Sequence, residues 1–270
     1  MTTAVSDAPK VSGLTDTVAS ERTKYLSLRG TKVNLLLAVL VCAGMAAVVS
    51  STMTVTRDEP LESIPALDVF TAPMLGLDAA AIVLFIGAAS FFGAEFTKKQ
   101  GMVTFSVTPN RHRVLTAKVA VTFFVGTLVG VVCVVLAVLI GRAVGSQTGA
   151  AQLALTDPAA ARLMITTLFQ PVYYAIVVGL FAVALRSSVA AVGLGFVLVL
   201  IFPAFAGFLP DAAAQLIAPL FPRAAFDSFA GVAEAGSPES VPAWGGALVM
   251  IAWLALSWAL AARKLRSHDV

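Results

Sequence analysis

Long apolar runs alternate with short polar segments along the whole 270-residue chain. A helix rises 1.5 Å per residue, so about 20 apolar residues cross the roughly 30 Å hydrocarbon core of a bilayer. Six runs reach this length, and the pattern therefore predicts six membrane-spanning helices. We expect them at approximately Val33–Met53, Pro73–Ala94, Val114–Gly141, Arg162–Leu185, Val189–Leu209 and Ala243–Ala262.

The composition points to the same class of protein. Hydrophobic residues make up 59% of the chain and charged residues only 12%, with a mean hydropathy of +0.91. Soluble domains average about 25% charged residues, because their surface faces water. The chain is therefore predicted to be an all-α, polytopic membrane protein. Its first 32 residues are polar and too long for the n-region of a signal peptide, so we expect the first span to be retained.

The basic residues are distributed unevenly around the predicted spans. With the N-terminus in the cytoplasm, 14 of the 18 Lys and Arg residues fall on the cytoplasmic side. The other side then holds only Arg57, Arg142, Arg162 and Arg223. Cytoplasmic loops of membrane proteins carry an excess of Lys and Arg, so this bias predicts that both termini are cytoplasmic.

Local signals mark several helix ends and contacts. Asp157-Pro158 is typical of an N-cap followed by proline at the first helical position. Arg186-Ser187-Ser188 leaves only a tight turn between spans four and five, and Pro203 should kink span five. Gly126 and Gly130 stand four residues apart in span three, a spacing that lets membrane helices pack closely.

Two segments outside the spans are also predicted to be helical. After a disordered tail (residues 1–13), Leu14–Gly30 should form an amphipathic helix on the inner membrane surface, capped by Asp16 and ended by Gly30. Glu21 stands out because it falls in the middle of the apolar stripe of that helix. The stripe consists of Leu14, Val18, Tyr25 and Leu28. The remaining residues, 31–270, form the six-span domain.

The proline-rich segment Pro210–Pro242, between spans five and six, contains apolar stretches too short to cross a bilayer. Ala212–Ala218 and Ala224–Ala230 are the two clearest of these stretches. They predict short helices that cover the bundle from outside.

Motifs for catalysis and ligand chemistry are missing from the sequence. There is no HExxH, no GxSxG and no GxxxxGK[ST], and the two histidines, His112 and His268, lie outside the predicted spans. Cys42 and Cys133 are isolated in apolar runs, as buried cysteines usually are. We therefore expect no catalytic residue, no metal site, no cofactor bound by this chain and no nucleic acid as a partner.

Asp78 is the one candidate for an intramembrane carboxylate. It precedes Glu95 by 17 residues, or about 25 Å along a helix, which places it near the outer headgroups. We favour an interfacial or first-turn aspartate over an ion-coupling site. The source of energy for any transport is then expected to lie outside this chain.

The loop between spans two and three is the richest polar segment. A basic loop is expected on the cytoplasmic side whatever the function. Pro109-Asn110 can start a short helix there, however, and Phe105 and Val107 give it an apolar side. A short amphipathic element of this kind suits docking into a groove on a soluble partner.

Two motifs resemble those of ABC-2 type transporter permeases, the membrane subunits of bacterial ABC exporters. The stretch Ser20–Arg29, with its Glu, Lys and Ser-x-Arg, resembles the surface helix before the first span of that family. The run Thr-Pro-x-Arg-x-Arg-Val-Leu-x-Ala-Lys, ending at Lys118, resembles the family's coupling segment. The layout of six spans extends the resemblance over nearly the whole chain. Arg22, where an aromatic residue often stands, and a long loop at Arg142–Ala161 depart from the pattern.

The resemblance implies a permease that pairs with a second permease, identical or related, and with two separate ATPase subunits that carry ATP and Mg. It assigns ATPase coupling to Glu95, Thr108, Pro109, Asn110, Arg111, Arg113 and Lys118, and the surface helix to Glu21, Lys24, Tyr25 and Arg29. Glu21 would pair with a base such as Arg111 or Arg113. The protein would export a drug, peptide, lipid or glycan across a bacterial plasma membrane.

Two alternatives stay open. A non-transporting membrane immunity or regulatory subunit would bind a partner but stimulate no ATP turnover. A secondary carrier driven by an ion gradient would depend on Asp78 and need no ATPase.

Overall fold

The structure, a computed structural model, describes residues 13–57, 63–97, 111–233, 236–237 and 240–266. The predicted disordered tail lies almost entirely outside the described residues. The described part of the chain folds into helices joined by turns and loops, without any strand. In chain order these are α1 (Leu14–Ser27), α2 (Arg29–Arg57), α3 (Ala66–Thr71), η2 (Ala72–Met74), α4 (Leu75–Thr97), α6 (Arg111–Thr148), α7 (Pro158–Leu185), α8 (Ser188–Phe196), η3 (Val197–Ile201), α9 (Phe202–Ala206), α10 (Asp211–Ile217), η4 (Ala218–Leu220), α11 (Pro222–Ala230) and α12 (Ala243–Arg266).

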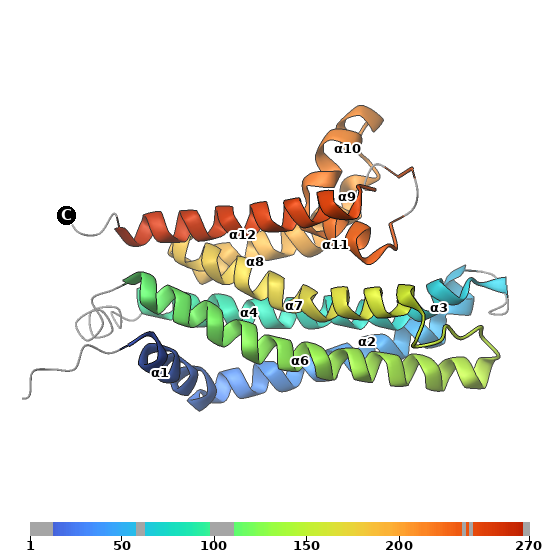
Figure 1. Cartoon of the computed structure of the whole chain (residues 1–270), viewed down its shortest axis with the longest axis horizontal. Helices are drawn as coiled ribbons and strands as arrows, with labels where there is room; N and C mark the ends of the chain where they lie inside the picture. The colour runs from blue at the N-terminus through green and yellow to red at the C-terminus, as the bar shows by residue number, and fades with distance from the viewer. Residues whose placement is uncertain (1–12, 58–62, 98–110, 234–235, 238–239, 267–270) are drawn as a thin grey trace, which may run out of the picture.

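Six of these helical stretches are long and apolar enough to cross a membrane, which confirms the predicted number of spans. They are Arg29–Met53, Ala66–Ala94, His112–Thr148, Pro158–Leu185, Ser188–Phe205 and Ala243–Arg266. The spans lie side by side. Helix α1 and the last turn of α12 lie at the same end of the bundle (Figure 1). Arg266 Nε–H donates to His112 Nε2 over 3.0 Å at this end, which we call the α1 end. The opposite end, which holds α3 and α11, is the α11 end.

Helix α7 forms the centre of the bundle. In its most apolar stretch 78% of the residues are buried, against 22% in α2, in the fifth span and in α12. It packs against α4, α6, α8, α11 and α12. The apolar side chains exposed on the outer helices are the ones that would face lipid, because a bilayer replaces water as their solvent.

Several predicted helix ends are confirmed. Asp157 is the N-cap of α7, and its carboxylate accepts a 2.8 Å hydrogen bond from the Ala159 N–H. Arg186 ends α7 in the left-handed conformation, with φ of 53°, and Ser187 caps α8 by accepting from Ala190 N–H. The chain therefore reverses between spans four and five in only two residues.

Span five is interrupted as its proline predicts, but by a π-helical segment rather than a simple bend. Phe202 N–H donates to Val197 O, five positions back, at the end of η3. Pro203 follows immediately and has no N–H with which to continue the α-helical ladder. The predicted short helices of the Pro210–Pro242 segment are present as α10 and α11.

Three predicted boundaries are wrong. The helix predicted at Leu14–Gly30 ends at Ser27, because Leu28 is extended, and Gly30 lies inside α2. Asp16 occupies the third helical position and accepts from the N–H of Gly13, which is the actual N-cap. The long loop predicted at Arg142–Ala161 is shorter, because α6 continues through polar residues to Thr148 and α7 begins at Pro158.

Candidate functional site

Helix α1 buries a face that differs from its predicted apolar stripe. Its buried residues are Thr17, Glu21 and Tyr25, which are spaced four apart and so share one face. Leu14 and Leu28, two members of the predicted stripe, are 48% and 54% exposed. The face with the carboxylate packs on the beginning of α6, so α1 is held by protein rather than by lipid alone.

A buried ion pair joins α1 to α6. Lys118 Nζ lies 2.8 Å from Glu21 Oε2, and the two side chains are only 5% and 2% exposed. The second oxygen, Glu21 Oε1, accepts from Lys24 Nζ over 2.6 Å. Each oxygen of this carboxylate therefore has an ammonium partner, as a charge in this environment requires.

Aromatic residues enclose the pair. Lys118 Nζ lies 4.0 Å from the centre of the Phe91 ring and 3.4 Å from the Phe91 carbonyl oxygen. The Tyr25 ring meets Phe91 edge-on at 4.6 Å. Burial alone would raise the pKa of Glu21, but attraction and hydrogen bonding to Lys118 and Lys24 outweigh it and lower that pKa. Burial raises the pKa of Tyr25 to about 12. We call Glu21, Lys118, Lys24, Tyr25 and Phe91 the α1–α6 junction.

Lys118 is the coupling-segment base that the structure brings to Glu21. The expected partners were Arg111 or Arg113, but Lys118 lies one to two turns further along α6, on the face toward α1. Arg113 is half-buried, and Arg111 begins α6. Thr108, Pro109, Asn110 and the Arg111 side chain lie outside the described residues, as does the side chain of Glu95 near the end of α4. Arg29 is exposed at the start of α2.

The glycine pair of span three lies against α7. A Cβ atom added to Gly126 would come within 3.3 Å of Val172 Cγ2, and one on Gly130 within 2.5 Å of the Leu168 carbonyl oxygen. Real Cβ atoms essentially never come that close to a backbone oxygen. Gly130 therefore allows the backbones of α6 and α7 to approach each other.

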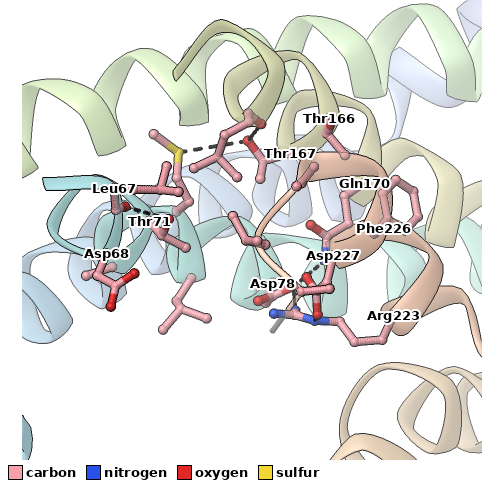
Figure 2. A pocket seen from close by; sticks show the side chains of 18 of the residues that line it. Leu67, Asp68, Thr71, Asp78, Thr166, Thr167, Gln170, Arg223, Phe226 and Asp227 are labelled. Carbon is pink, nitrogen blue, oxygen red and sulfur yellow. Dashed lines mark hydrogen bonds and ion pairs between the residues drawn. The ribbon is translucent and has the colours of Figure 1, made fainter. Parts of the chain in front are cut away.

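A cavity of about 760 Å³ opens at the α11 end. Its walls come from α2, α3, η2, α4, α7 and α11, so it gathers segments that are far apart in the chain. Figure 2 shows Asp78, Gln170, Arg223, Phe226 and Asp227 together on one side of it, with Leu67, Asp68 and Thr71 on the other. The apolar part of the wall includes Met53, Met74 and Leu163.

A charged cluster lies in the cavity wall. Arg223 Nη1 is 2.5 Å from Asp78 Oδ1, and Arg223 Nε–H donates to Asp227 Oδ2 over 2.9 Å. Gln170 Nε2 also donates to Asp78 Oδ1. Asp78 is in the first turn of α4 and Arg223 in that of α11, so the cluster ties the α11 segment to span two.

Burial and mutual attraction set the protonation of this cluster. Burial lowers the pKa of Arg223, but the carboxylates of Asp78 and Asp227 outweigh it and raise that pKa. Burial also raises the pKa of Asp227, and attraction to Arg223 offsets only part of this rise. Tyr174 is fully buried within electrostatic range of Arg223, and its hydroxyl has no hydrogen-bond partner among the described residues.

Sequence reasoning missed this cavity. It placed Asp78 near the outer headgroups and assigned Arg223 to the same side, without bringing the two together. The available signal was the Arg–Asp spacing of four residues within a short helix that begins at Pro222, because such pairs share a helix face. Within the described ranges, no group of three or more His, Cys, Asp or Glu side chains could hold a metal ion.

No model of a protein family matches the chain, and no curated protein is significantly similar to it.

Proposed function

We propose that the chain is the membrane subunit of an ATP-driven exporter, with ATP hydrolysed on separate subunits. The observation that carries the proposal is the buried ion pair between Glu21 and Lys118. It links a helix that precedes the first span to Lys118, the last residue of the run that resembles a coupling segment. A docking surface assembled from both elements would move as one piece with the bundle.

The likeness of these two segments to ABC-2 type permeases supports the same proposal. In it, the α1 end faces the cytoplasm, where most of the basic residues would then lie. Closure of the ATPase subunits would rock this permease against a second one, identical or related, and move a drug, peptide, lipid or glycan outward. The membrane would be a bacterial plasma membrane.

The test is co-purification of the tagged full-length protein in mild detergent. The variant Arg111→Glu/Arg113→Glu reverses two charges of the proposed docking segment. Lys32→Glu/Arg263→Glu reverses two exposed charges at the same end of the bundle and serves as the matched control. We expect a subunit with a GxxxxGK[ST] motif, together with MgATP hydrolysis, in the eluates of wild type and control only.

Two other outcomes would contradict the proposal. If wild type brings down no such subunit, the protein is better explained as a non-transporting immunity or regulatory subunit. If the docking variant and the control lose the ATPase equally, the charges of Arg111 and Arg113 have no special role in docking.

A further inference from the structure

We infer that the cavity at the α11 end is a binding site for an organic cation, a positive group on an apolar body. Ligand pockets for small molecules typically measure about 300–1,000 Å³, combining apolar walls with a few placed polar groups. The volume of about 760 Å³ falls in this range. This inference does not depend on ATP-driven export, because it concerns what the chain binds by itself.

The charge of the walls selects the sign of the ligand. Among the described residues of the wall, the carboxylates of Asp68, Asp78 and Asp227 outnumber the guanidinium of Arg223. Arg223 bonds to Oδ1 of Asp78 and to Oδ2 of Asp227. An ionised carboxylate has about four lone-pair sites, so both groups can accept further donors. An anion would instead meet net repulsion and a guanidinium that is already paired.

The remaining wall suits the apolar body of such a ligand. Val49, Met53, Leu67, Met74 and Leu163 contribute aliphatic or thioether side chains. Methionine is flexible and polarisable, so it adapts to ligands of irregular shape. The cavity therefore offers an apolar surface directly beside its excess of negative charge, a combination that matches an amphipathic cation better than a metal ion or a sugar.

The test compares two probes of the same shape and opposite charge. The full-length protein is placed in nanodiscs, and the binding of tetraphenylphosphonium and tetraphenylborate is measured by calorimetry, with empty nanodiscs as the blank. We expect saturable binding of the phosphonium alone. Equal binding of both probes would reduce the site to an apolar pocket and overturn the inference, and so would phosphonium binding that does not exceed the blank.

Charge variants then locate the site. Asp78→Asn should weaken phosphonium binding about tenfold, through the loss of one nearby attraction. Arg223→Gln should strengthen it, because this variant removes the positive charge of Arg223 from the wall. A purely structural role of the cluster predicts weaker binding in both variants, and this result would contradict the assignment.

Folding is checked independently by gel-filtration profile and melting temperature. Asp68→Asn leaves the bonds among Asp78, Arg223 and Asp227 intact. If Asp78→Asn fails to fold, Asp68→Asn replaces it, and we expect this variant to weaken phosphonium binding as well. Unchanged phosphonium affinity in every folded aspartate variant would exclude this cavity as the site. Loss of ATPase co-purification in the experiment above would leave the present result unaffected, so the two proposals fail separately.

Discussion

Glu21 and Lys118 are 97 positions apart in the chain, yet their charged atoms lie 2.8 Å apart in a nearly dry environment. Glu21 is on the helix before the first span and Lys118 is near the beginning of the third. Replacing such a pair with apolar residues is often neutral, whereas removing one partner leaves an uncompensated buried charge. The pair therefore acts chiefly by fixing α1 in one position on α6.

This asymmetry predicts a strongly non-additive pair of substitutions. Lys118→Met should cost about 3–5 kcal/mol, because it strands the Glu21 carboxylate beside Phe91 with only Lys24 as partner. Glu21→Gln/Lys118→Met should recover much of that loss. Thermal unfolding in detergent measures both, with Arg29→Met, which changes an exposed base, as the control. If the destabilisation of the double variant equals the sum of those of Glu21→Gln and Lys118→Met, the ion pair is contradicted.

The contribution of Glu21 to stability should also depend on pH. Its pKa is lowered in the folded protein from an ordinary value of 4.5, so the unfolded state takes up its proton first as the pH falls. The stabilisation is complete above about pH 4.5 and is lost as the pH falls through the folded-state pKa. The difference in melting temperature between wild type and Glu21→Gln should therefore shrink below pH 4.5. A constant difference across that range would show that Glu21 acts without its charge.

The close approach of α6 and α7 predicts opposite outcomes for two glycines. Gly130→Ala places a Cβ against the Leu168 carbonyl and should destabilise the protein by about 1–3 kcal/mol. Gly44→Ala, in the first span, meets no atom within 4 Å and should be neutral or slightly stabilising. Melting temperatures of the two variants make the comparison. If both variants lower the melting temperature equally, the destabilisation arises within each helix and not from the contact between α6 and α7.

Two adjacent tyrosines of α7 give a further matched pair. The Tyr173 hydroxyl donates to the Met250 carbonyl over 3.0 Å, so Tyr173→Phe should cost about 0.5–1.5 kcal/mol. The hydroxyl of Tyr174 has no hydrogen-bond partner among the described residues, so Tyr174→Phe should be neutral or stabilising. Denaturation midpoints of the two variants test this difference in sign. A loss for Tyr174→Phe as large as that for Tyr173→Phe would indicate a partner for its hydroxyl.

The spans could be predicted from the sequence because each rests on a strong local signal. An apolar run of about 20 residues has few interpretations, and Asp157 caps its helix through its own neighbours. Helix ends were less predictable, because hydropathy follows only the apolar part of a helix. The polar residues Ser146 to Thr148 extend α6 well past the predicted Gly141.

The candidate sites depend on contacts between distant segments, which a single sequence does not encode locally. That Glu21 needed a partner was evident from its place on α1, but the choice of Lys118 depends on how α1 lies against α6. Asp78 and Arg223 meet only because α11 folds back onto the bundle and packs against α7 and α12. No periodicity within either segment indicates that meeting.

The π-helical segment η3 gives span five a tolerance that its neighbours lack. A π turn contains one more residue than an α turn, and here Phe202 bonds to Val197 across it. Deleting one residue between Val197 and Ile201 can convert the turn to α-helix and leave both flanking stretches in register. The same deletion within α7 would rotate every following side chain by about 100°. Span five can therefore lose one residue without a change of helical register, whereas the central helix α7 cannot.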